Sequence, residues 1–98
     1  MFVKNFSDED MKWFVCIENF APIGMAALDK NNEIRCLLVD SSERRKGIAS
    51  KLIEEIEKYA AEKGIKRLTS TTLISNVPTQ NLFKKLGYKE LFKYEKNS

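Results

Sequence analysis

The sequence predicts a mixed α/β fold in which an antiparallel meander of strands is followed by a β-α-β unit, in the order β-β-β-β-α-β-α-β. Residues 2–39 hold four short apolar or alternating runs separated by polar turns, which is typical of strands. Residues 48–63 repeat apolar residues at helical spacing. A length of 98 residues accommodates one hydrophobic core, so we expect a single domain, residues 1–98.

The four predicted strands of the first half cover residues 2–6, 13–17, 23–28 and 33–39. The sequence Ser7-Asp-Glu-Asp predicts a turn or a brief helix, so only residues 7–12 separate the first two strands. The second hairpin turn lies either at residues 18–19 or at residues 20–22, where a proline favours a break. Asp29-Lys-Asn-Asn then predicts the turn between two antiparallel strands.

The second half begins with a helix over residues 48–63, which Gly64 ends in the position usual for a left-handed cap. A threonine-rich strand over residues 65–75 follows, and the connecting helix makes it parallel to the strand at 33–39. A short helix over residues 79–86 has a proline at its start, and the last strand covers residues 88–94. The two helices should cover the faces of the sheet.

Composition excludes several classes of protein. With 43% hydrophobic and 32% charged residues, the chain is neither disordered nor membrane-spanning, and we expect a cytoplasmic protein. A net charge of +3 is too small and too unclustered for a dedicated nucleic-acid binder. Cys16 and Cys36 lie in apolar strand-like runs and are expected to be buried free thiols, with a disulfide or a nucleophile as the alternative. The absence of histidine removes the usual Ser–His and Cys–His pairs and most zinc sites, so we expect no metal.

The stretch from Val39 to Leu52 predicts an anion site. A strand leads through a basic loop with a glycine into the start of a helix, where free N–H groups and the helix dipole attract negative charge. Four cations surround this turn, and no acidic residue lies between positions 44 and 51: the cations are Arg44, Arg45, Lys46 and Lys51. A phosphate-bearing ligand is the hypothesis; a turn glycine among solvated cations is the alternative.

The same stretch resembles the central motif of the GNAT superfamily of acyl-CoA-dependent N-acetyltransferases. That motif is a strand ending in Val, a few residues, and Arg/Gln-x-x-Gly-x-Gly/Ala at a helix start. Here it stands as Val39, Arg44, Gly47 and Ala49, with Leu52 at the family's apolar position.

A second family segment, Asn-x-x-Ala-x-x-Leu-Tyr-x-Lys-x-Gly-Phe, is also matched. Its counterparts in this chain are Asn76, Leu82, Lys85, Gly87 and Tyr88, with Thr79 in place of the alanine and Phe83 in place of the tyrosine. Together the two segments place the resemblance over roughly residues 12 to 94. It implies that the two parallel strands splay apart and that the pantetheine arm of coenzyme A lies in the gap.

By this resemblance, the pyrophosphate binds at the helix start, and the strand backbone and Asn76 hold the pantetheine. Asn76 has the alternative role of a helix cap before Pro78. The resemblance implies a coenzyme A site made of Leu37, Leu38, Val39, Arg44, Arg45, Lys46, Gly47, Ile48, Ala49, Ser50, Asn76 and Phe83.

The catalytic residues follow less directly. Glu33, in the pattern Glu-Ile-x-x-Cys, resembles the base glutamate of the histone-acetylating branch; its alternative role is a polar residue after a turn. Phe83 stands where many members carry a tyrosine that protonates the departing thiolate, and phenylalanine has no proton to donate. Tyr88 is the candidate substitute acid, with Cys36 as a further option.

The predicted function is transfer of an acetyl group from acetyl-CoA to a primary amine, on a small molecule or a protein lysine, by direct attack on the thioester. The alternative is a coenzyme A-binding module with little catalysis; a small basic interaction domain is the third option. Family members usually place two helices between the first two strands, and those helices form much of the acceptor wall. Their absence predicts an acceptor site that is open or shared with a second subunit, as in a homodimer.

Overall fold

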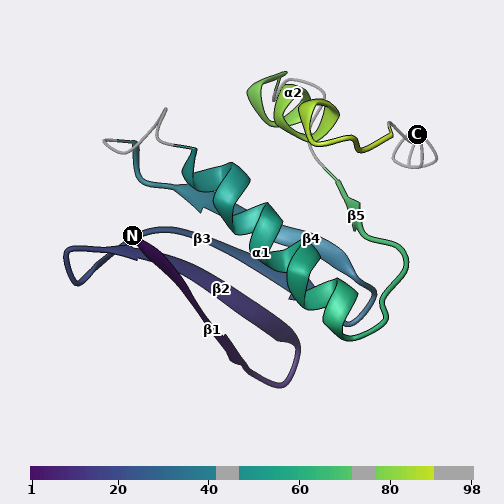
Figure 1. The fold of residues 1–98 in the computed structure, drawn as a ribbon, viewed down its shortest axis with the longest axis horizontal. Coiled ribbons are helices and arrows are strands. Elements are labelled where there is room, and N and C mark those ends of the chain that lie inside the picture. Colours follow the sequence, from purple (N-terminus) through teal and green to yellow (C-terminus); the bar gives the residue numbers. More distant parts are fainter. Residues whose placement is uncertain (42–46, 72–76, 90–98) are drawn as a thin grey trace.

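The computed structural model describes residues 1–41, 47–71 and 77–89 (Figure 1). Its strands are β1 (Phe2–Ser7), β2 (Met11–Glu18), β3 (Ala21–Asp29), β4 (Glu33–Val39) and β5 (Thr69–Ser70), and its helices are α1 (Ile48–Glu62) and α2 (Val77–Lys85). One sheet has the strand order β1-β2-β3-β4-β5. Neighbouring strands are antiparallel except for β4 and β5, which are parallel. The predicted mixed sheet, meander and β-α-β unit are confirmed; the predicted last strand falls almost wholly outside the described residues.

The core lies between α1 and one face of the sheet. Alternate residues of the strands are buried there, among them Phe14, Cys16, Ala26, Leu28 and Ile34. The helix supplies Ile48, Leu52, Ile53, Ile56 and Ala60, the i, i+3, i+4 pattern of one helix face. Figure 1 shows α1 lying across the strands, while α2 lies beyond β4 at the β5 end of the sheet. We call the sheet surface opposite α1 the open face.

Gly24 sets how closely α1 approaches the sheet. A Cβ built on this residue would lie 2.8 Å from the Cγ2 atom of Ile48 and 3.3 Å from the Cδ1 atom of Leu52. Only a residue without a side chain therefore lets the first turn of α1 rest on β3. Because Gly24 also pairs with Val39, the start of the helix is stacked over the end of β4.

The link between β1 and β2 is shorter than predicted, because β2 begins at Met11 rather than at residue 13. The Asp8 carboxylate explains this. Its Oδ1 atom accepts hydrogen bonds of 2.8 Å from the N–H groups of Asp10 and Met11, and its Oδ2 atom accepts one of 2.8 Å from the Trp13 indole. The side chain thus replaces backbone partners in the turn, which is the role expected of aspartate there.

The second hairpin turn consists of Asn19 and Phe20, with φ angles of 51° and 65°. Two successive left-handed residues match the twist of a two-residue hairpin. The turn spans the boundary of the two predicted alternatives. The predicted break at Pro22 is wrong, since this residue lies inside β3 opposite Ile17, beside an irregularity in the pairing.

Beyond α1, the predicted strand at residues 65–75 is too long at its start. Gly64 has a φ angle of 73°, and the N–H of Ile65 still donates to the carbonyl of Ala60 over 2.9 Å. The chain leaving the helix cap enters the sheet only at Thr69, and residues 72–76 lie outside the described part. Helix α2 starts two residues earlier than predicted, and Gly87, with a φ angle of 91°, follows its end.

Candidate functional site

One edge of β4 is left without a strand partner in the described part of the chain. Strand β5 pairs only with Glu33 and Ile34, and the Ser70 hydroxyl donates a 3.3 Å hydrogen bond to the Ile34 carbonyl. From residue 35 to residue 39, no pairing with β5 is described, with residues 72–76 lying outside the description. An unpaired strand edge presents a row of N–H and C=O groups that an extended ligand can bind.

A bulge interrupts β4 along this edge. The pairing with β3 shifts between Met25 and Ala27, where Ala26 alone faces the two residues Cys36 and Leu37. Cys36 has a φ angle of 56°, a left-handed conformation that residues other than glycine rarely adopt. A bulge leaves one residue out of the ladder and redirects its backbone groups, and such features are frequent next to active sites. No glycine or asparagine in β4 indicates it, and the expected burial of Cys36 is wrong, since this residue is exposed at the bulge.

The end of this edge meets the start of α1. Gly47 is the N-cap residue, with φ 73° and ψ 21°, and it has no side chain to cap the helix. The N–H groups of the first turn point out of the helix, since the first intrahelical bond runs from the N–H of Lys51 to the Gly47 carbonyl over 3.0 Å. No acidic residue occupies the first turn. The helix start therefore offers N–H donors and a positive dipole end beside the last residue of β4.

The described members of the predicted coenzyme A site lie along these two features, except for Phe83, which lies on α2. Leu37 and Val39 are half-buried on β4, and Leu38 is 62% exposed. The Ile48 side chain is 2% exposed in the core, so only its backbone is available to a ligand. Ala49 and Ser50 are half-buried in the first turn. Arg44, Arg45, Lys46 and Asn76 lie outside the described residues.

Phe83 and Tyr88 form a packed pair rather than an open pocket. The Phe83 ring is 8% exposed and meets the Tyr88 ring edge-on, with 5.0 Å between centroids and 73° between planes. The Tyr88 hydroxyl donates a 2.9 Å hydrogen bond to the Oε2 atom of Glu57 on α1. Burial, followed by the hydrogen bond and charge of Glu57, raises the pKa of Tyr88 above its ordinary value. The proton of the candidate acid is thus directed toward α1.

Glu33, the candidate base, is the first residue of β4 and is half-buried. It lies opposite Thr69, and its N–H donates to the Asp29 Oδ1 atom over 3.0 Å. Because Ile34 faces α1, strand alternation directs the Glu33 side chain toward the open face. It lies three positions before the bulged Cys36, a separation of roughly 10 Å along a strand. A proton path between the two positions therefore needs an intervening water or the acceptor itself.

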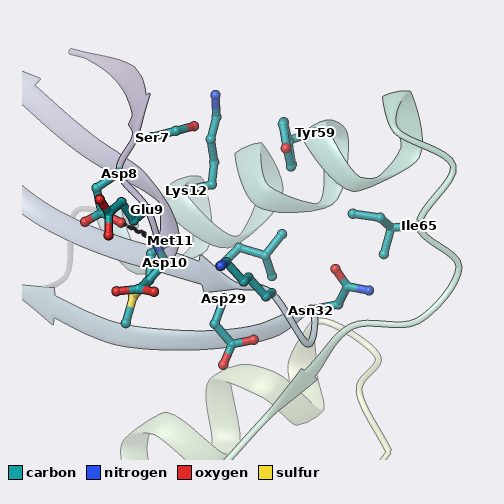
Figure 2. Close-up of a pocket in the computed structure, with 12 residues that line it drawn as sticks. Ser7, Asp8, Glu9, Asp10, Met11, Lys12, Asp29, Asn32, Tyr59 and Ile65 are labelled. Carbon is teal, nitrogen blue, oxygen red and sulfur yellow. Dashed lines mark hydrogen bonds between the residues drawn. The ribbon is translucent and has the colours of Figure 1, made fainter.

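A cavity of about 290 Å³ lies at the opposite end of the sheet, away from Gly47. Figure 2 shows it between the β1–β2 turn, the start of the β3–β4 turn and the C-terminal half of α1, with Tyr59 and Ile65 on the helix side. Four carboxylates line it, but both Asp8 oxygens already hold the turn. None of the predicted site residues lines this cavity. Among the described residues, no group of acidic, cysteine or histidine side chains is arranged to hold a metal ion.

No described helix has the length and apolar character that crossing a bilayer requires. The fold has close counterparts among solved structures. An aminoglycoside N-acetyltransferase, AAC(6')-Iy in complex with a bisubstrate analog, superimposes with a TM-score of 0.77 at 21% identity, covering 85% of this chain and 65% of that one. An aminoglycoside acetyltransferase from an uncultured soil metagenomic sample gives 0.72 at 25% identity, covering 86% and 62%.

A third counterpart is a putative streptothricin acetyltransferase from Bacillus anthracis str. Ames in complex with acetyl coenzyme A. It superimposes with a TM-score of 0.74 at 24% identity, covering 82% of this chain and 48% of that one. This chain thus spans less than two thirds of the length of all three. Comparison with curated protein sequences gives no match. The family model described as "Acetyltransferase (GNAT) family" matches residues 2–88. The chain therefore belongs to the GNAT acetyltransferase family.

Proposed function

We propose that this chain binds acetyl-CoA and transfers the acetyl group to a primary amine. The observation that carries the proposal is the stacking of the uncapped, left-handed Gly47 at the start of α1 over the end of the unpaired β4 edge. That arrangement fits a ligand with an extended, amide-bearing arm and an anionic end. The pantetheine arm would bind the backbone of residues 37–39, and the pyrophosphate would bind the first-turn N–H groups, with the predicted help of Arg44, Arg45 and Lys46.

The reaction has three requirements: removal of a proton from the amine, stabilisation of the oxyanion and a proton for the departing thiolate. The amine nitrogen attacks the thioester carbonyl carbon, a C–N bond forms, and the C–S bond breaks as the thiolate leaves and takes up a proton. A β4 backbone N–H released at the Cys36–Leu37 bulge is suited to stabilise the oxyanion. Glu33 accepts the amine proton through water. Since Phe83 carries no proton and Tyr88 is bonded to Glu57, the thiolate takes its proton from water or from the acceptor ammonium.

We propose a small-molecule amine as the acceptor class. Two of the counterparts named above are aminoglycoside acetyltransferases and a third is a putative streptothricin acetyltransferase, and these names support an amine on a small polycationic molecule. A lysine side chain of a protein remains the other acceptor type to test. In the described part of the chain, the three residues Asp8, Glu9 and Asp10 link β1 to β2 without a helix, which leaves room for either acceptor.

Calorimetric titration with acetyl-CoA tests the donor half of the proposal. Gly47→Glu should weaken binding by about 10-fold or more, because it places a carboxylate at the helix start. Gly47→Ala is the control for backbone strain, since its φ angle of 73° disfavours any side chain while no atom lies within 4 Å of the added Cβ. Lys58→Gln, exposed on α1, controls for the change in net charge, because both variants lower it by one unit. Absence of wild-type binding at about 1 mM, or roughly −4 kcal/mol, overturns the proposal.

The second candidate is a coenzyme A-binding module with little catalysis. The packed Phe83–Tyr88 pair favours it. Phe83 has no proton to donate, and the Tyr88 hydroxyl is already hydrogen-bonded to Glu57. Release of free thiol from acetyl-CoA, measured with aminoglycosides, polyamines, amino acids and lysine peptides, separates the two candidates. Binding without turnover across this set selects the module, and turnover with any member selects the enzyme.

A further inference from the structure

The open face of the sheet is apolar over most of its area. Cross-strand partners share a face, so the pairing registers define its members. They are Phe2, Lys4 and Phe6 on β1; Met11, Trp13, Val15 and Ile17 on β2; Met25, Ala27 and Asp29 on β3; and Glu33, Arg35 and Leu38 on β4. Four of them carry charge, Lys4, Asp29, Glu33 and Arg35, and Asp29 and Arg35 form an ion pair at 3.6 Å.

No helix in the described part of the chain lies over this surface at β1–β3 (Figure 1), although Ala27, its smallest member, is 0% exposed. Phe2, Phe6 and Leu38 are 56%, 52% and 62% exposed. Trp13 and Val15 at its centre are half-buried, whereas residues of the α1-facing side fall to a few percent. Figure 1 places α1 on the other side and α2 beyond β4.

An antiparallel sheet with one wet face normally alternates apolar and polar residues. Here β2 carries Phe14 and Cys16 toward α1, and Trp13, Val15 and Ile17 toward the open face. Apolar residues on both sides of a strand are typical of burial on both sides. An exposed apolar surface of this extent marks an interaction site rather than a solvated one. The strands are therefore suited to a second covering layer.

We propose that this layer is a second copy of the chain, with the two open faces packed against each other in a symmetric homodimer. The layout of the face supports this occupant. A two-fold axis parallel to the strands places β1 of one copy over β4 of the other, so that members of the same row meet. Phe6 and Arg35 share one row, and Lys4 and Leu38 share the next.

Across the interface, the Phe6 ring of each copy then covers the Arg35 guanidinium, a cation–π contact, while the Lys4 stem covers Leu38. The ion pair with Asp29 in the neighbouring row neutralises the charge of Arg35. At the centre, where β2 of one copy lies over β3 of the other, Val15 meets Met25 and Trp13 meets the small Ala27. Two packed sheets with apolar inner faces make a sandwich, a stable arrangement for such strands.

The area of the open face limits the strength of this dimer. Treated as flat, four strands about 4.8 Å apart and roughly 24 Å long give about 450 Å² per copy, or ~900 Å² in total. Specific interfaces begin at about 1,000 Å², so the dimer should be weak, with a Kd in the micromolar range. The face shares Leu38 and Glu33 with the proposed site, but the mass and the Trp13 emission are measured without acetyl-CoA or turnover, so the test does not depend on the proposed function.

Sedimentation velocity between about 5 and 200 µM, spanning a micromolar Kd, tests the mass. The weight-average mass should rise from the 11.3 kDa of one chain toward twice that value. Trp13, the only tryptophan, lies on the open face and reports where the contact forms. Its emission should shift to the blue over the same concentration range, because the indole leaves water.

Phe2→Glu/Phe6→Glu tests the face directly, since both side chains are exposed and their replacement spares the core. This variant should stay monomeric with a constant Trp13 emission, after circular dichroism has shown that it folds. Phe20→Asn is the matched control: it removes the fully exposed ring at the hairpin turn, and asparagine suits its φ angle of 65°. The control should dimerise as the wild type does.

Three results overturn the proposal. The first is a wild type that stays at 11.3 kDa throughout. The second is a dimer whose formation leaves the Trp13 emission unchanged, which places the contact elsewhere. The third is a folded Phe2→Glu/Phe6→Glu variant that dimerises like the wild type. A monomer whose Trp13 emission shifts on adding phosphatidylglycerol vesicles falls under the first result and assigns the face to a lipid surface.

Discussion

The Tyr88 hydroxyl donates a 2.9 Å hydrogen bond to Glu57, and this bond connects the residues after α2 to α1. The chain between these two residues includes β5 and α2, so the bond closes the β-α-β-α part of the fold on itself. The same geometry directs the phenol toward α1. Tyr88 therefore has a structural task in this chain, whether or not it also donates a proton in catalysis.

Tyr88→Phe should lower the free energy of unfolding by about 1 kcal/mol, the value of a partly exposed hydrogen bond to a charged group. The pKa of Tyr88 is raised in the folded state above its ordinary value of 10.0, so this contribution is fully present below pH 10 and is lost as the pH rises through the raised value. Urea unfolding of the two proteins at pH 7, 9 and 10.5 measures the difference. Tyr59→Phe is the control, because the Tyr59 ring acts through packing against Phe14.

The kinetic readout of Tyr88→Phe separates the two roles. If the residue serves structure alone, kcat for thiol release changes little at temperatures where both proteins are folded. A loss of about 100-fold or more in kcat with unchanged stability identifies Tyr88 as the acid instead.

Gly24→Ala should destabilise the fold by about 1–3 kcal/mol, because the added methyl group would lie 2.8 Å from the Ile48 Cγ2 atom. A double-mutant cycle with Ile48→Ala tests the cause. The two changes should cost less together than the sum of their single effects, since Ile48→Ala removes the clashing atom. Additive costs would show that the contact does not limit the approach of α1.

The two cysteines should differ sharply in reactivity. Cys36 is exposed at the bulge, whereas Cys16 is 0% exposed and burial raises the pKa of its thiol. Iodoacetamide followed by mass spectrometry should find one fast site, and Cys36→Ser should remove it. Acetyl-CoA should slow the labelling of Cys36 if the pantetheine binds the bulged edge. Labelling that acetyl-CoA leaves unchanged contradicts this placement of the arm.

Glu33→Gln should lower kcat/KM by about 10²- to 10⁴-fold, the usual contribution of a general base, while the affinity for acetyl-CoA stays as in the wild type. The pH profile is the diagnostic measurement. The loss of kcat/KM should be smaller at high pH, because more of the acceptor amine is already neutral there. Glu54→Gln, exposed on α1, is the matched control. An unchanged rate at pH 7 contradicts the assignment of Glu33.

The predictable elements are those whose pattern is local. Strand β4 was predicted with its observed bounds, because the polar turn Asp29-Lys-Asn-Asn precedes it and a polar loop follows it. Helix α1 was predicted to within one residue, since Gly64 adopts the left-handed conformation that its position indicated. The coenzyme A residues were placed by the resemblance, and those in described regions lie along one strand edge and one helix start, except for Phe83 on α2.

The features that were missed depend on contacts across the sheet. Pro22 looked like a break, but it occupies an irregular position in the pairing where its missing N–H is tolerated. The threonine-rich run predicted a long β5, yet the hydrogen bonds that end α1 delay the entry of the chain into the sheet. The left-handed Cys36 had no local signal, because its conformation follows from pairing two residues of β4 with one of β3.

That extra residue also resets the parity of β4. Ile34 and Val39 are an odd number of positions apart, so in a regular strand their side chains would leave opposite sides of the sheet. With the bulge, both belong to the α1 side: Ile34 pairs with Leu28, and Val39 pairs with Gly24 beneath Ile48. A regular pairing of the same residues, without the bulge, would therefore turn Val39 outward and Leu38 inward. Val39 would then no longer lie beside Gly24 under the start of α1, so the bulge both frees the edge offered to a ligand and keeps β4 in the register that the helix needs.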